Sequence, residues 1–187
     1  MAAQYNEVDY GPLRTLIGIW QGDKGLDIAP ERAGPEENPY YESLSVEPAG
    51  DVTNAESQQL VAVYYRQVVT KKASGKVFHD QCGYWIWDAA AGVVMQTLTI
   101  PRGVCVVADG HVVVEADRVK LDVTADSETG SGRIAESPFM QSQARTLSFT
   151  HRLTVCGDRL SYAETTMVDI YGKVYEHGDR NELTRSR

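Results

Sequence analysis

The feature that most constrains this chain is a succession of short β-type segments that begins at Tyr40 and continues almost to the C-terminus. The segments are rich in Val, Thr, Tyr and Ile, which favour extended backbone. They read YYESLSVEP, SQQLVAVYYRQVV, VFHDQCGYWIWD, GVVMQTLTI, GVCVVA, HVVVEA, VKLDVTA, ARTLSFTHRLTV, RLSYAETTMVDIYG and KVYEHGDRNELTR. The sequence therefore predicts about ten strands.

The segments between these strands are short and carry Gly or Asp: EPAGD, KASGK, DAAAG, ADG, DSETGSG, CGD and YGK. Turns of this kind join consecutive antiparallel strands, which makes the strand order a meander. Closure into a barrel hides the two edges of such a sheet, and a barrel of about ten strands leaves room inside for a small molecule. We therefore predict a single all-β domain over residues 1–187, an up-and-down antiparallel barrel with its ligand in the lumen.

Three segments depart from the strand pattern. Gly11 to Leu16 is predicted to form a short helix, because Pro12 lies at its start and Gly18 follows its end. The proline-rich and acidic stretch from residue 27 to 39 is unsuited to a central strand, and is either a rim loop over the barrel mouth or a solvated surface loop. The apolar PFM at residues 138–140 is predicted to touch the lumen mouth.

Charge and composition exclude several classes of function. The net charge is −8 and the 18 basic residues are scattered, so nucleic acid is not an expected partner. No apolar run approaches the roughly 18 residues that span a bilayer, and the N-terminus lacks the features of a signal peptide. We expect a soluble, cytoplasmic protein. Cys82, Cys105 and Cys156 are too widely spaced for a structural zinc site and are expected as buried small side chains, with a reactive thiol as the alternative.

His151 lies in a strand whose alternation is clear. Leu147, Phe149, His151, Leu153 and Val155 share one face of the predicted strand, and polar residues occupy the other. The imidazole therefore faces an apolar side. It is either a core histidine that bonds to a neighbouring strand or a ligand-binding group.

The other three histidines have different settings. His79 shares a face with Gly83 and Trp85, where the absence of a side chain at Gly83 beside large rings is predicted to make room for a flat ligand. His111 follows the ADG turn and is expected to be exposed. His177 lies in the last predicted segment.

No hydrolytic motif is present: the sequence lacks G-x-S-x-G, H-E-x-x-H and a Gly-rich phosphate loop. What remains is an apolar lumen with isolated imidazoles. A neutral imidazole in an apolar pocket suits haem, whose iron takes a protein nitrogen as an axial ligand.

The segment LIGIWQGDKG supports this reading. With the short helix before it, it resembles the first strand of the nitrobindins, haem-binding barrels of the fatty-acid-binding-like type, through Gly18, Trp20 and Gly22. The segment PYYESLSV is similar to the second strand of that family. In calycin-like barrels a tryptophan at this place closes one end of the barrel, so we expect Trp20 to be structural.

Two further segments carry the resemblance. VFHDQCGYWIW is similar to the family's His-x-x-x-Gly-aromatic strand through His79, Gly83 and Tyr84. LSYAETTMVDIYGKVYEH resembles the long strand with a methionine, a turn and the haem-ligating histidine, so the resemblance makes His177 the iron ligand and places Met167 and His79 at a haem b site. It implies chemistry with nitric oxide, nitrite or peroxynitrite: isomerisation of peroxynitrite to nitrate if the protein is an enzyme, reversible binding of nitric oxide if it is not.

Two alternatives remain open from the residues. A cofactor-free barrel would carry a fatty acid or another small apolar molecule, with Arg66, Arg145 or Arg152 as candidates to meet its carboxylate, although the alternation places Arg152 outside. A barrel packed solid would instead act as an interaction protein. The sequence does not decide between a monomer and a homodimer.

Overall fold

The computed structural model describes residues 8–186, which form eleven β-strands and two short helices. The elements in chain order are a 3-10 helix (Gly11–Leu16), β1 (Gly18–Ala29), β2 (Glu36–Ala55), β3 (Gln58–Lys71), β4 (Val77–Asp88), β5 (Val93–Ile100), β6 (Val104–Val114), β7 (Arg118–Asp126), β8 (Arg133–Glu136), α1 (Pro138–Gln143), β9 (Ala144–Cys156), β10 (Arg159–Ile170) and β11 (Lys173–Arg185). No helix within residues 8–186 is long and apolar enough to cross a bilayer.

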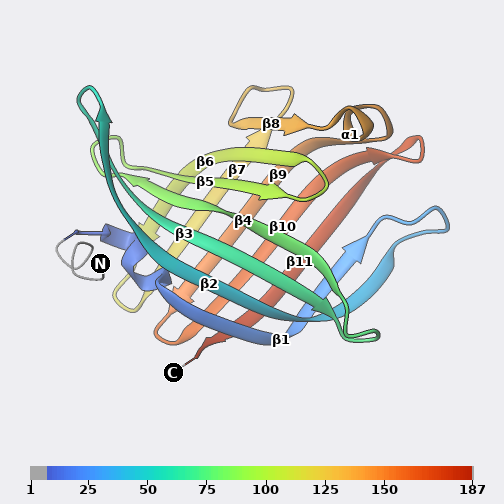
Figure 1. The fold of residues 1–187 in the computed structure, drawn as a ribbon, viewed down its shortest axis with the longest axis horizontal. Coiled ribbons are helices and arrows are strands. Elements are labelled where there is room, and N and C mark those ends of the chain that lie inside the picture. The colour runs from blue at the N-terminus through green and yellow to red at the C-terminus, as the bar shows by residue number, and fades with distance from the viewer. Residues whose placement is uncertain (1–7, 187) are drawn as a thin grey trace.

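Ten of the strands close into a barrel, as predicted. Each pairs antiparallel with its neighbours, β1 pairs with β11, and the β5–β6 pairing completes the ring. The short β8 bonds to the start of β6 at residues 104–107, whereas β7 bonds to the rest of β6 from residue 109 onward. Figure 1 shows the strands curving round one axis. Closure leaves no long strand edge without hydrogen bonds, which explains how so large a sheet needs few helices.

Two of the predicted turns are strand interiors. EPAGD lies within β2, where the register against β3 shifts between Pro48 and Gly50, and the chain turns only after Ala55. ADG lies within β6, where a Cβ on Gly110 would come within 1.9 Å of the Asp122 carbonyl oxygen. Gly110 is therefore required by the close approach of β7 and not by a turn.

The stretch from residue 27 to 39 is less irregular than predicted. Its two ends belong to β1 and β2, where Asp27 is paired with Asn38, and only residues 30–35 form the connecting turn. Pro30 and Arg32 line the cavity described below, so the turn is a rim loop.

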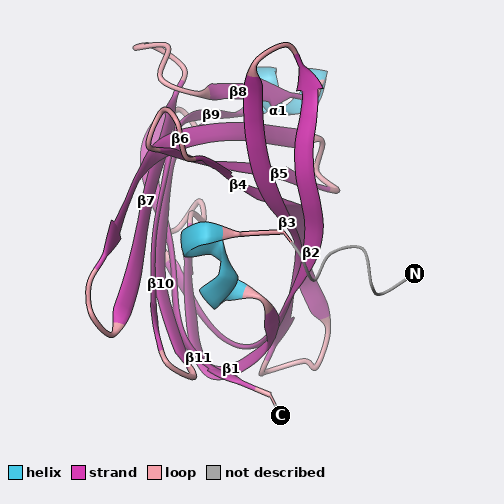
Figure 2. Cartoon of the chain, turned by 90° about the vertical axis from the view of Figure 1, so that its left-hand side faces the viewer, coloured by secondary structure: helices cyan, strands magenta, loops and turns pink. Residues whose placement is uncertain are grey.

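The 3-10 helix is confirmed at its predicted bounds and closes one end of the barrel (Figure 2). Trp20 beneath it is fully buried, donates from Nε1 to the Leu16 carbonyl oxygen at 2.7 Å, and packs its ring 4.0 Å from the Arg185 guanidinium carbon. The structural role predicted for Trp20 thus follows from its surroundings.

The other end of the barrel carries α1, a helix that the sequence analysis did not predict. Ser137 caps it by accepting a hydrogen bond from the Met140 amide, and Pro138 occupies its first turn. Phe139 and Met140 line the cavity mouth, as predicted for the PFM segment.

Candidate functional site

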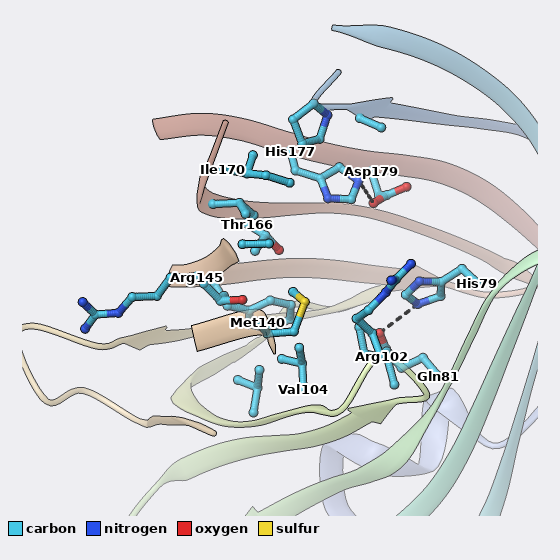
Figure 3. A pocket seen from close by; sticks show the side chains of 18 of the residues that line it. His79, Gln81, Arg102, Val104, Met140, Arg145, Thr166, Ile170, His177 and Asp179 are labelled. Carbon is cyan, nitrogen blue, oxygen red and sulfur yellow. Dashed lines mark hydrogen bonds and ion pairs between the residues drawn. The ribbon is translucent and has the colours of Figure 1, made fainter. Parts of the chain in front are cut away.

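A large cavity opens at the α1 end of the barrel, with a volume of about 1570 Å³. Its wall combines apolar side chains with a group of polar ones (Figure 3). The apolar part includes Val104, Val106, Met140, Phe149 and Ile170, and the polar part includes Asp27, His79, Gln81, Arg102, Glu164, Thr166, His177 and Asp179. The lumen predicted from the strand number is therefore present.

Strand register places the polar groups at one level of the barrel. Asp179 on β11 is paired with Asp27 on β1 and with Glu164 on β10, and Glu164 is in turn paired with His151 on β9. The row continues on the other side to Asn38 on β2. Because paired residues point to the same face, three carboxyl groups on adjacent strands meet inside the barrel.

His177 lies on the same face of β11 as Asp179 and joins this row. Its Nε2 is 2.7 Å from Oδ1 of Asp27 and 3.5 Å from Oδ2 of Asp179, and Asn38 donates from Nδ2 to the other oxygen of Asp27 at 3.0 Å. Burial by itself would lower the pKa of His177, but the hydrogen bond with Asp27 and the negative charges of the neighbouring carboxyl groups raise it.

Asp179 and Glu164 both hold their protons more tightly than usual. Burial, strengthened by the charges of Asp27 and Glu42 and opposed by His177, raises the pKa of Asp179 to about 7. Burial and the charge of Asp179 raise the pKa of Glu164 to about 8. The site therefore keeps Glu164 largely protonated at neutral pH.

A chain of hydrogen bonds runs from the cavity wall into the core. His79 Nε2 bonds to Oε1 of Gln81 at 3.2 Å, and the Gln81 amide donates to the Tyr65 hydroxyl at 2.8 Å. From the other side, Gln96 donates to the same hydroxyl at 2.9 Å and bonds through Oε1 to His151 Nδ1 at 2.9 Å. The two amides thus assign the protons to His79 Nε2 and His151 Nδ1.

His151 is a core histidine, which is the first of the two roles predicted for it from the sequence. Its ring is buried, lies 5.5 Å from the ring centroids of Trp85 and Tyr162, and does not line the cavity. Burial lowers its pKa to about 3. The predicted alternation is confirmed from Phe149 to Val155, where every second side chain faces the core. A bulge between β9 and β10 interrupts this alternation before Phe149, and Leu147 is therefore only half-buried.

A further buried carboxylate, outside the row of three, lies next to the cavity. Glu42 accepts hydrogen bonds from Tyr162 at 2.7 Å, Asn181 at 2.8 Å and Gln67 at 3.0 Å. Burial raises its pKa in spite of these donors. Since Gln67 and Tyr162 line the cavity, this network fixes the position of part of its wall.

The structure brings two of the three predicted site residues together. His177 and His79 both line the cavity. Met167 does not: it lies between the lining residues Thr166 and Val168 of β10, and alternation with Glu164, Thr166 and Val168 turns it to the opposite face. The prediction of Met167 at the ligand site is therefore not supported by its position.

Gly83 also has a different role from the predicted one. A Cβ at this position would come within 1.9 Å of the Thr97 carbonyl oxygen on β5, and Gly83 does not line the cavity. The glycine is needed for the approach of two strands, not for a flat ligand. The cysteines differ as well: Cys105 is exposed, Cys82 and Cys156 are half-buried, and all three are free.

His111 and Arg152 lie as predicted, whereas Arg66, a candidate for the lumen, lies on the exterior. His111 is exposed. Arg152 and Arg66 are exposed and pair with Asp122 and Asp80 on the barrel exterior, whereas Arg145 lines the cavity.

Asp27, Asp179 and Glu164 were not among the site residues predicted from the sequence. Asp179 was detectable, because His177, Asp179, Asn181 and Leu183 alternate with residues of the other face in a single strand. The only signal for Asp27 was its position at the end of the first strand.

Comparisons with known proteins agree with this architecture. The family model described as "THAP4-like, heme-binding beta-barrel domain" matches residues 9–185. The crystal structure of Rv2717c from M. tuberculosis is similar in fold, with a TM-score of 0.70, 21% sequence identity, and coverage of 96% of this chain and 100% of that one. No curated protein matches the chain in sequence. Because the family model spans nearly the whole barrel, the chain belongs to the THAP4-like heme-binding β-barrel domain family, the nitrobindins, as its sequence resemblance indicated.

Proposed function

We propose that this barrel holds a b-type haem in its cavity with His177 as the axial ligand. The observation that carries the proposal is the state of the His177 ring: Nε2 bonds to Asp27, whereas Nδ1 has no hydrogen-bond partner among residues 8–186. An imidazole held at one nitrogen by a carboxylate presents the other to a metal, with fixed orientation and increased basicity. Family membership supports the same role.

The cavity fits such a group in size and in chemistry. Its volume of about 1570 Å³ exceeds the roughly 300–1,000 Å³ typical of small-molecule sites. Val104, Met140 and Phe149 supply apolar surface for a flat macrocycle, and Arg102 supplies a guanidinium group for one of its carboxylates. His79 adds a second imidazole to the wall, and burial lowers its pKa, which favours the neutral form.

The bound haem iron would supply a site for nitric oxide or peroxynitrite, and we propose reversible binding of nitric oxide or isomerisation of peroxynitrite to nitrate as its use. The chain itself would exclude bulk water with its apolar wall. Asp27 would hold the proton of the His177 ring at Nε2, and Asn38 would hold Asp27 in turn.

The test is a haemin titration followed by absorbance. Wild type is expected to give a saturable shift of the Soret band, and His177→Ala to lose or alter it. His111→Ala is the matched control, because His111 is exposed and lies outside the cavity. Absence of saturable binding in wild type, or the same spectrum in wild type and His177→Ala, would refute the assignment.

One observation favours a second candidate, a carrier of an apolar carboxylate such as a fatty acid. Arg102 and Arg145 line a cavity that also has extensive apolar wall. Displacement of a fluorescent fatty acid from haem-free protein, weakened in Arg102→Ala and in Arg145→Ala, would support the carrier. Failure to bind the probe would exclude it.

A further inference from the structure

The row of carboxyl groups described above contains a compact set of metal-ligand atoms. One ligand atom each from Asp27, His177 and Asp179 lies within 4.8 Å of the other two. We infer that these three residues form a site for a divalent transition-metal ion in the haem-free protein. The site goes beyond the proposed haem function and does not depend on it.

The cluster has little positive charge of its own. Asp27 is only 3% exposed, and within residues 8–186 the ion pairs of Asp27 and Asp179 are with His177 alone; neither pairs with a lysine or an arginine. Glu164 adds a third carboxyl group on the next strand at the same level. Buried carboxylates are costly unless a positive charge compensates them, and one imidazole balances only one of the two carboxylates of Asp27 and Asp179.

Asn38 provides an independent observation. Its side chain is buried and donates from Nδ2 to Asp27 and to Glu36, but its Oδ1 has no hydrogen-bond partner. Buried amide oxygens are rarely left without a partner. The amide nitrogen of Asn38 thereby fixes one oxygen of Asp27, and the other oxygen of Asp27 faces His177 in the cluster.

The donor set indicates which ions would bind. One imidazole nitrogen with two carboxylate oxygens suits Zn²⁺, Co²⁺ or Mn²⁺, and is less suited to the all-oxygen preference of Ca²⁺ and Mg²⁺. Three protein ligands leave a coordination position free, as in catalytic zinc sites, and His177 and Asp179 both line the cavity to which that position would open.

The same imidazole would serve haem and the metal ion. In the cluster the ion uses Nε2 of His177, which now contacts Asp27, whereas the proposed haem ligand is the other nitrogen. We expect the two to hinder each other, because each fixes the ring in its own orientation.

The test is a titration of tag-free, haem-free, chelator-treated protein with Co²⁺, followed by its visible d–d absorption, with Zn²⁺ as the competitor. Wild type is expected to bind one Co²⁺ per chain, which Zn²⁺ displaces. Asp27→Asn and Asp179→Asn are each expected to weaken binding at least about tenfold. Asp169→Asn is the matched control: Asp169 lines the cavity but is exposed and lies outside the cluster.

The outcomes separate this inference from the haem proposal. Lack of saturable Co²⁺ binding, or equal loss in the control and the cluster variants, would overturn the metal site whatever the haemin titration shows. Saturable Co²⁺ binding that needs both Asp27 and Asp179 would support it even where haemin does not bind. If Asp27→Asn does not fold, the half-buried Asp179 still provides the comparison.

Discussion

Glu164→Gln tests whether burial of the Glu164 carboxyl group makes the free energy of unfolding depend on pH. The carboxyl group faces Asp179 on β11 and His151 on β9, with His177 and Glu42 nearby, and burial raises its pKa from 4.5 to about 8. The folded protein therefore binds this proton more tightly than the unfolded chain. The stabilisation is fully present below pH 4.5 and is lost as the pH rises through about 8.

The magnitude follows from the size of the shift. At about 1.4 kcal/mol per pKa unit, the three units between about pH 5 and pH 8 correspond to roughly 4 kcal/mol of unfolding free energy. Glutamine keeps the shape of the side chain and does not titrate. Relative to Glu164→Gln, wild type should lose about this amount of stability between about pH 5 and pH 9.

The assay is urea unfolding of ligand-free wild type and variant across this pH range. Glu37→Gln is the control, since Glu37 is exposed, and its pH profile should match that of wild type. If the profiles of wild type and Glu164→Gln run parallel, Glu164 does not hold its proton as described and the argument from burial fails.

Three further predictions concern the rest of the barrel. Gly83→Ala should destabilise the protein strongly in urea unfolding, because its Cβ would meet a β5 carbonyl oxygen, whereas Gly178→Ala, with nothing nearer than 4.0 Å, should be close to neutral. Trp20→Phe should cost about 1–3 kcal/mol by the same measurement, since it leaves the buried Leu16 carbonyl oxygen without its donor. Below pH 6.5 wild type should lose stability faster than His151→Phe, because burial lowers the pKa of His151 to about 3 and the unfolded chain takes up the proton first; equal acid profiles would contradict this.

The barrel was predictable because strand composition and most turns are local signals. The two predicted turns that proved wrong, EPAGD and ADG, have one cause in common. In both of them a glycine, Gly50 or Gly110, lies within a strand. Gly50 lies at a register shift between β2 and β3, and Gly110 lies where β7 approaches β6 closely. Both situations favour glycine, so the local sequence has the same composition as a hairpin turn. The outward orientation of Met167 could also have been predicted from the alternation of residues along β10.

The site was only partly predictable because its contacts are far apart in the sequence. His177 could be found from its likeness to a known family, and alternation gave the face of His151. That Asp27 meets His177 across 150 residues depends on the register between the first and last strands, which no local pattern encodes. Asp27 also stands at the start of a proline-rich and acidic stretch, where composition indicates a loop.

The two ends of the barrel differ in what their side chains contribute. At the closed end, Trp20, Leu13 and Leu16 are fully buried apolar groups, and the tryptophan donates the hydrogen bond that burial requires. At the open end the strands bring carboxyl groups together, and two of those groups have raised pKa values. A barrel selected for stability alone would place apolar residues at these positions, because replacing buried charges with well-packed apolar groups is often stabilising. Their presence is therefore better explained by a ligand that contacts them than by the fold, and both proposed occupants, an iron atom held by His177 and a divalent cation held by the cluster, would lie at this level of the barrel.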